Sequence, residues 1–323
     1  MTSVSPRKPR AAFMGTPDFA VPCLEALLDV ADVPLVVTQP DKAQGRGLEL
    51  APPPVKLLAQ SRGIPVFQPL KARDGALRDR LRELDLDFAL VVAYGKILPQ
   101  DVLDAPRLGC LNVHGSLLPR WRGAAPIQWS VVSGDRETGV CLMQMDAGMD
   151  TGPVLLREVV AIAPSETGGE LFERLSKLSG ELVRNSIPRF MAGELLPEAQ
   201  STEGVTHARM IEKSDGALDF SHSAQAVHDR ARGFYPWPGA YTALAGKRIK
   251  IHRTEVARSE GSPAEPGTVL VADASGIEVA CAQGTVRLLE LQPEGKKRMA
   301  AAAFLAGHPI PKGARFANHQ ELL

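Results

Sequence analysis

The sequence has few cysteines, and none of them is arranged to hold a metal. Only four occur among 323 residues, and no two form a C-x-x-C pair. Cys23, Cys110 and Cys141 lie in apolar surroundings, so buried and reduced thiols are expected rather than a metal site. The first expected strand is also not followed by G-x-G-x-x-G, the usual signature of a dinucleotide cofactor.

Long apolar runs and an excess of one charge are also missing. No uninterrupted apolar stretch approaches the roughly 18 residues that a membrane helix needs. The basic N-terminal segment lacks the apolar core of a signal peptide. We therefore expect a cytoplasmic protein without a membrane segment. The 37 basic and 37 acidic residues cancel, so the overall charge indicates no polyanionic partner.

The first half of the chain alternates short apolar segments with amphipathic ones. Apolar strands between amphipathic helices favour a mostly parallel, Rossmann-like α/β sheet covered on both faces. In such sheets, ligands bind beyond the carboxyl ends of the strands. The strands are expected near 11–14, 33–38, 64–67, 88–93, 110–113 and 140–145, and the helices near 18–30 (with Asp18 as N-cap), 54–61, 74–84 and 167–190.

The pattern changes after residue 190. Residues 191–206 are rich in Gly, Pro, Glu and Ser and are expected to form a linker. Beyond them, one helix and five short strands at regular spacing favour a small OB-like β-barrel. The sequence therefore predicts an α/β domain over 10–190, a linker over 191–206 and an OB-like domain over 207–323.

The densest chemical signal lies at the end of the strand expected at 110–113. Asn112 and His114 are two residues apart and share one face of an extended strand, and Gly115 permits a sharp turn beside them. An amide and an imidazole placed together can stabilise a carbonyl oxygen that gains negative charge. His114 is the only histidine before residue 207. A merely structural histidine is the alternative, and the residues alone leave both interpretations open.

A second candidate site is the glycine-rich loop MDAGMDTG at 145–152, which contains Asp146 and Asp150. A carboxylate near an imidazole orients the ring and favours its protonated form. Aspartates that precede glycine usually cap turns instead. Taken alone, this loop favours the structural interpretation.

Together these segments resemble the folate-dependent formyltransferases. VHGSLLPRWRG matches that family's Ser-Leu-Leu-Pro signature, and the spacing of Asn112, His114 and Asp150 agrees with its Asn–His–Asp catalytic group. The resemblance continues through FMGTPDFAVP, VVAYGKILP, MDAGMDTG and ARGFYPWPGAY, so it covers nearly the whole chain. It is greatest to the branch that acts on methionyl-tRNA, since the glycinamide ribonucleotide branch resembles only the first domain.

The resemblance implies transfer of a formyl group from 10-formyltetrahydrofolate to the amino group of initiator methionyl-tRNA, without a metal. It implies that Asn112, His114 and Asp150 are catalytic. It also implies a folate-binding segment, which consists of Ser116, Leu117, Leu118 and Pro119. Two alternatives remain: a family member that acts on another amine or on water, and a nucleic-acid-binding protein with a degenerate α/β domain. The intact Asn–His–Asp set disfavours the second.

Basic residues in both halves are candidates for contact with the RNA. The resemblance implies that the polar loop at 39–54, with Lys42 and Arg46, enters the acceptor stem; a solvated crossover loop is the alternative. Lys247, Arg248 and Lys250 gather on one expected strand, which fits binding to an RNA backbone or an ordinary solvated face.

Two tryptophans, Trp121 and Trp237, could in principle stack on a base or a cofactor. Buried packing is the expected role for both.

Overall fold

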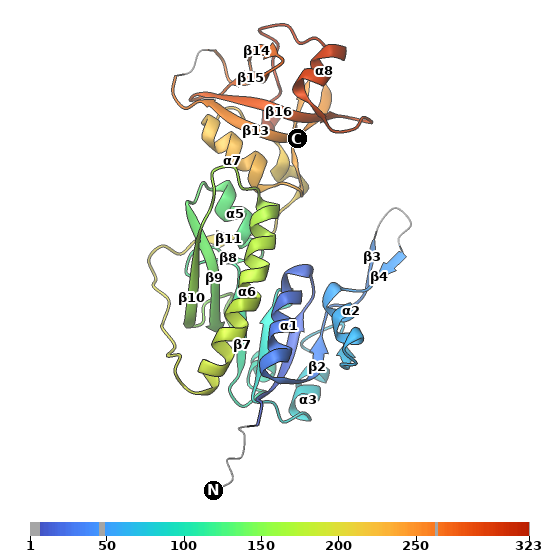
Figure 1. Cartoon of the computed structure of the whole chain (residues 1–323), viewed down its shortest axis with the longest axis vertical. Helices are drawn as coiled ribbons and strands as arrows, with labels where there is room; N and C mark the ends of the chain where they lie inside the picture. The colour runs from blue at the N-terminus through green and yellow to red at the C-terminus, as the bar shows by residue number, and fades with distance from the viewer. Residues whose placement is uncertain (1–6, 45–48, 262–263, 323) are drawn as a thin grey trace. The chain divides into compact units, whose positions relative to one another are not determined.

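The computed structural model describes residues 7–44, 49–261 and 264–322, which form two compact units (Figure 1). The first unit contains the chain up to Pro126, together with Thr138–Val160 and Phe172–Ala208. The second contains Ile127–Glu137, Ala161–Leu171 and the chain from Arg209 onward. The second unit thus combines the C-terminal part with two short segments from earlier in the chain.

The first unit is built on a seven-stranded sheet in the order β10-β9-β7-β6-β1-β2-β5 (Figure 1). Strands β7, β6, β1, β2 and β5 are parallel, and β9 is antiparallel to β7. The mostly parallel sheet predicted from the apolar segments is therefore confirmed. The strands are β1 (Arg10–Gly15), β2 (Asp32–Val37), β5 (Val66–Phe67), β6 (Phe88–Val92), β7 (Cys110–His114), β9 (Glu137–Gln144) and β10 (Val154–Ala161).

Helices connect these strands. Asp18, which was expected to cap the first helix, instead lies in a 3₁₀ turn (Asp18–Ala20) that follows Pro17, and α1 starts at Val21. Proline suits the start of a helix because its fixed φ matches the first turn, where no amide partner is needed; Pro22 does this in α1. The helices are α1 (Val21–Val30), α2 (Pro54–Ser61), α3 (Ala76–Arg82), α4 (Gln100–Leu103), α5 (Pro126–Val132) and α6 (Gly168–Met191).

Aromatic contacts fasten α6 to the rest of the first unit. Phe172 packs against Phe19 with ring centroids 5.3 Å apart, and Phe190 meets Phe88 of β6 edge-on at 6.0 Å. Every residue of β6 and β7 is buried. The polar side chains of β7 therefore stand at the end of a strand whose other residues belong to the core.

The expected loop at 39–54 contains a short antiparallel hairpin, β3 (Lys42–Gln44) with β4 (Glu49–Ala51). The ammonium group of Lys56 fixes its base by donating to both carboxylate oxygens of Asp41, each at 2.8 Å, and to Gln68 at 2.9 Å. This hydrogen bonding from Lys56 lowers the pKa of the Asp41 carboxyl. Gln68 completes the cluster by donating to the carbonyl of Gln39 at 2.8 Å.

The second unit contains an antiparallel sheet in the order β12-β13-β16-β15-β14. Its strands are β12 (Ala240–Leu244), β13 (Lys247–Arg258), β14 (Val269–Asp273), β15 (Gly276–Ala280) and β16 (Thr285–Pro293), accompanied by helices α7 (Ala224–Gly233) and α8 (Ala301–Gly307). Val227, Ile249, Val279 and Leu288 belong to its buried apolar core. The predicted β-rich second fold is confirmed, whereas α8 was not expected from its alanine-rich sequence.

Residues 314–317 join the two edge strands of this sheet. The amide of Val269 donates to the carbonyl of Ala314 at 2.8 Å, and Phe316 donates to Gly267 at 2.9 Å. On the other side, Ala317 donates to Ala243 of β12 at 2.8 Å. This segment satisfies backbone groups at both edges and so closes the sheet into a small barrel.

None of the helices in the described part of the chain combines the length and the apolar character that crossing a membrane requires.

All four cysteines are free and buried. Burial raises the pKa of Cys110 to about 12, of Cys141 to about 11 and of Cys281 to about 12, and it raises the pKa of Cys23 as well. We predict that a thiol reagent at pH 8 modifies none of them in the folded protein and all four in denaturant. A cysteine that reacts at once in the folded protein would contradict this.

The same burial predicts how stability depends on pH. Because the folded-state thiol pKa values are raised, the folded protein holds protons that the unfolded chain releases above about pH 8.5. The contribution of the thiols to stability is therefore full below that pH and is lost as pH rises toward the folded values. Denaturant unfolding between pH 8 and pH 10 measures this fall, which should be shallower in Cys110→Ala.

Candidate active site

The imidazole of His114 has a protein neighbour at each of its nitrogens. Nε2 lies 2.9 Å from the carbonyl oxygen of Trp121, and Nδ1 lies 3.6 Å from Oδ2 of Asp150. A carbonyl oxygen can only accept, so Nε2 carries a hydrogen and donates it. Nδ1, the other ring nitrogen, faces the carboxylate of Asp150. The side chain of His114 is buried, with 6% of its surface exposed.

Both residues that contact the ring have an unusual backbone. Trp121 has φ 63° and Asp150 has φ 53°, in the left-handed region that non-glycine residues rarely occupy. Each such residue costs of order 1–3 kcal/mol and persists only where its surroundings enforce it. Residues with such backbone conformations cluster at functional sites. Trp121 and Asp150 therefore indicate a functional site around His114, independently of any sequence motif.

Several hydrogen bonds hold Asp150 in this position. Its Oδ2 accepts from the amide of Gly123 at 2.8 Å, and its carbonyl accepts from the side chain of Gln200 at 2.8 Å. Gln200 also donates to the carbonyl of Gly152 at 2.7 Å and accepts from Arg122. One glutamine thus fixes the loop that carries Asp150.

Gly123 cannot carry a side chain here. It lies in β8 (Arg122–Gly123), which pairs with β11 (His207–Ala208). Its φ is 122°, and a Cβ would approach the carbonyl oxygen of Ala208 to 2.6 Å. The amide that binds Asp150 therefore depends on a glycine at this position.

Asn112 precedes His114 on the same face of β7 and is 9% exposed. Within the described residues, its side-chain amide has no hydrogen-bond partner. Buried amides normally have partners, so this one is available to a bound molecule. Asn112, His114 and Asp150 therefore place a free amide donor near a paired imidazole and carboxylate.

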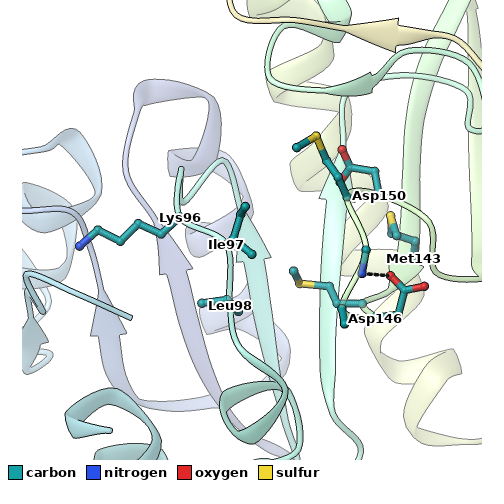
Figure 2. Close-up of a pocket in the computed structure, with 10 residues that line it drawn as sticks. Lys96, Ile97, Leu98, Met143, Asp146 and Asp150 are labelled. Carbon is teal, nitrogen blue, oxygen red and sulfur yellow. Dashed lines mark hydrogen bonds between the residues drawn. The ribbon is translucent and has the colours of Figure 1, made fainter. Parts of the chain in front are cut away.

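A cavity of about 160 Å³ adjoins Asp150. Figure 2 shows Ile97 and Leu98 on one side and Asp146 and Asp150 on the other. Met143 and Met145 add apolar surface. Lys96 is anchored away from Asp150, donating to the carbonyls of Pro69 at 2.5 Å and Leu70 at 2.9 Å (Figure 2). The cavity is thus largely apolar, with the carboxylates of Asp146 and Asp150 on one side.

Asp146, the other carboxylate of the loop, is occupied within its own turn. Its Oδ1 accepts from the amide of Gly148 at 3.1 Å (Figure 2) and from the hydroxyl of Thr151 at 2.7 Å. These contacts shape the loop, and only Asp150 faces His114.

The expected folate-binding segment packs against Met143, one of the residues that line the cavity. Ser116 is fully buried and donates to the carbonyl of Arg120 at 2.6 Å. Leu118 packs with Cys141 and Met143, and Leu117 lies against the same cluster. Neither these residues nor Pro119 is among those that line the cavity, so their contact with folate stays a prediction.

The predicted RNA contacts fall into two groups. Lys42 is exposed at the start of the hairpin, whereas Arg46 lies outside the described residues. Lys247, Arg248 and Lys250 are all exposed on β13. Since side chains alternate along a strand, Arg248 and Lys250 share one face and Lys247 lies on the other.

Three parts of this site were not predicted from the sequence. Trp121 contributes a backbone carbonyl, Gln200 lies in the expected linker, and the 96–98 segment follows β6. Only the last carried a usable signal, because it comes directly after an apolar strand. In the part of the chain that the structure describes, no group of His, Cys, Asp and Glu side chains is arranged to hold a metal ion.

We predict that Gln200→Ala destabilises the protein. The change removes hydrogen bonds to two carbonyls and to Arg122, each worth about 0.5–1.5 kcal/mol, and should speed amide exchange at Gly123. Denaturant unfolding and hydrogen exchange provide the measurements. Thr202→Ala, at an exposed position nearby, is the control and should change neither. Equal stability of the two variants would contradict this account of the loop.

Known protein families match both halves of the chain. The family described as formyl transferase matches residues 10–187, and the one described as formyl transferase, C-terminal domain, matches 210–309. The methionyl-tRNA formyltransferase of Myxococcus xanthus is 53% identical over 308 residues, covering 95% of this chain and 98% of that protein. The corresponding protein of Geotalea daltonii is 47% identical, with 96% and 98% covered.

Solved structures share the fold at low identity. An N-formyltransferase from Helicobacter canadensis, in complex with folinic acid and dTDP-3-aminofucose, matches with a TM-score of 0.67 and 16% identity, over 89% of this chain and 99% of that one. Glycinamide ribonucleotide transformylase 1 from Symbiobacterium toebii matches with a TM-score of 0.51 and 19% identity, over 61% of this chain and 96% of that one. With both family segments present, the chain belongs to the formyl transferase family.

Proposed function

We propose that this protein transfers the formyl group of 10-formyltetrahydrofolate to the α-amino group of initiator methionyl-tRNA, in the cytoplasm. The observation that carries this proposal is the 53% identity over 95% of the chain to a methionyl-tRNA formyltransferase. Sugar N-formyltransferases match over a similar length but at 16% identity. The two family segments cover residues 10–187 and 210–309, whereas the glycinamide ribonucleotide enzyme matches over 61% of this chain.

The substrate's own amine is the nucleophile in this proposal. An α-amine has a pKa of roughly 7.7–8.0, so a useful fraction is neutral near pH 7 and needs no strong base. The buried thiols do not compete with the amine as nucleophiles, because burial raises their pKa and keeps them protonated. A bond forms between the amine nitrogen and the formyl carbon, and the bond from that carbon to the folate nitrogen breaks. The proton lost by the amine passes to the leaving nitrogen.

The main task of the protein is to stabilise charge and to move this proton. Asn112 stabilises the charge, because its amide is available to the formyl oxygen as negative charge develops there. The Nε2 of His114 is committed to Trp121, so Nδ1 is the nitrogen that donates toward the reacting groups. Asp150, 3.6 Å from Nδ1, stabilises the imidazolium and can relay the proton directly or through water.

We further propose that the cavity beside Asp150 receives part of the folate donor. Its volume of about 160 Å³ is well below the roughly 300–1,000 Å³ of a pocket for a drug-sized ligand. It therefore suits one ring system rather than the whole donor. In this proposal, Ser116, Leu117, Leu118 and Pro119 shape the folate site, since Leu118 packs against Met143, which lines the cavity.

The RNA contacts and the domain boundaries are also part of the proposal. In this proposal Lys42 and Arg46, together with the basic residues Lys247, Arg248 and Lys250, would neutralise phosphates. The family matches at 10–187 and 210–309 support functional domains near 10–190 and 207–323, with 191–206 between them.

We predict that Asn112→Ala and His114→Ala each lower the turnover of methionyl-tRNA by about 10²–10³-fold, the usual effect of losing one such donor. Asp150→Asn should cause a comparable loss by removing the charge that faces Nδ1. Single-turnover formylation measures the rates. Asp146→Asn, which alters only the turn, should have a milder effect. Near-normal turnover in either donor variant would refute the mechanism.

The identity of the acceptor needs a direct test. The protein should be incubated with 10-formyltetrahydrofolate and, in separate reactions, with methionyl-tRNA, a dTDP-linked amino sugar or water alone. We expect rapid formylation of methionyl-tRNA only, detected by mass spectrometry of the released formylmethionine. Faster transfer to the sugar amine or to water would replace the proposed function by the corresponding activity.

A further inference from the structure

A second and larger cavity lies in the second unit. It has a volume of about 540 Å³ and lies between the 236–238 loop, β12, β13 and the turn after β16. The lining side chains used in the following argument are Lys213, Trp237, Tyr241, Arg248, Lys250 and Glu294. We call this surface the Trp237 groove. Its volume falls within the roughly 300–1,000 Å³ of small-molecule sites.

Trp237 is exposed, contrary to the buried packing expected from the sequence. Fifty-three per cent of its surface is accessible, compared with 9% for Trp121. The third tryptophan, Trp129, is half-buried and donates from its indole nitrogen to the carbonyl of Arg209 at 2.8 Å. Among the described residues, no partner accepts from the indole of Trp237. A large, flat and apolar side chain is thus held open beside a cavity, where it can stack on a planar ligand.

The floor of the groove is positively charged. Arg248 lies over the ring of Tyr241, 3.6 Å from its centroid. The β12–β13 register sets Tyr241 directly opposite Lys250, so the three side chains share one face. Stacking fixes the Arg248 guanidinium while leaving its edge N–H groups able to donate.

These cations are not neutralised by neighbouring carboxylates. Within the described residues, no ion pair involves Lys213, Arg248 or Lys250, and Glu294 is the one carboxylate among the groove's lining residues. The groove therefore presents three cations and one anion beside an exposed indole. This combination matches a ligand with a flat aromatic part and a negative charge.

We propose that the Trp237 groove binds one unpaired nucleotide of the RNA substrate, with its base stacked on Trp237 and its phosphate held by Arg248 and Lys250. The inference rests on the proposed function, which supplies an RNA substrate. Binding of a phosphate backbone alone would require cations but not an exposed indole. Base stacking on aromatic side chains tolerates any base, so the groove should contribute affinity rather than sequence preference.

Tryptophan fluorescence tests the stacking directly. Trp237 is the most exposed of the three tryptophans, so a base stacked on it should quench the accessible part of the emission. We expect saturable quenching by a single-stranded oligoribonucleotide and by methionyl-tRNA, and little by a blunt RNA duplex of equal charge. Trp237→Phe should abolish the quenching. Equal quenching by the duplex, or quenching that survives in Trp237→Phe, would overturn the stacking.

Kinetics distinguish stacking from simple packing. Losing one stacked base should raise KM for methionyl-tRNA about 5- to 150-fold in Trp237→Ala while kcat stays unchanged. Trp237→Leu keeps apolar bulk but no ring, so it should behave like the alanine variant, whereas Trp237→Phe should stay near the parent. Equal losses in all three variants would indicate a packing role and overturn the proposal.

The phosphate contact has its own test. Lys250→Gln and Arg248→Gln should each reduce the slope of log K against log salt concentration for tRNA binding by about one. The matched control is Lys312→Gln, an exposed lysine of the same unit outside the groove, which should leave the slope unchanged. Identical slopes for Lys250→Gln and Lys312→Gln would overturn the phosphate contact.

Failure of this inference is distinguishable from failure of the proposed function. A parent protein that does not formylate methionyl-tRNA would refute the proposed function. If the parent protein formylates methionyl-tRNA but substitution of Trp237 does not change KM, and RNA does not quench the parent's fluorescence, only the groove proposal is refuted.

Discussion

The position of the His114 imidazole depends on two residues that hold strained backbones. Trp121 supplies a carbonyl to Nε2 and Asp150 a carboxylate near Nδ1, and both have positive φ. Their surroundings must offset a cost of order 1–3 kcal/mol each. The hydroxyl of Thr206 accepts from the amide of Trp121 at 2.8 Å, and Gln200 holds the Asp150 loop. Residues in the expected linker therefore stabilise the site.

The sequence predicts regular elements well where a single periodicity dominates. The bounds of α2 (Pro54–Ser61) agree with expectation, and the placement of Asn112 and His114 on one face near a strand end follows from side-chain alternation. The contacts of Trp121 and Gln200 with the site could not be predicted, because they use backbone carbonyls that leave no signature in side-chain identity. The exposure of Trp237 was also missed, because prolines on both sides remove the periodicity that distinguishes core from surface.

The proposed catalytic residues and the proposed RNA groove belong to different compact units. Asn112, His114 and Asp150 belong to the first, and Trp237, Arg248 and Lys250 to the second. Binding energy gained on a remote part of a substrate lowers KM, whereas interactions made only with the reacting atoms raise kcat. A protein organised in this way can therefore change its affinity for RNA without altering the residues proposed to stabilise the transferred formyl oxygen.

Closure of the small barrel by residues 314–317 also sets an order of events during synthesis. Strand β12 leaves the ribosome about 70 residues before the segment that covers its edge, a long sequence separation of the kind that slows folding. Until that segment emerges, β12 and β14 expose unpaired amides and carbonyls. Exposed strand edges are templates for pairing with other chains. The nascent chain can therefore pair with other copies through these edges until residues 314–317 cover them.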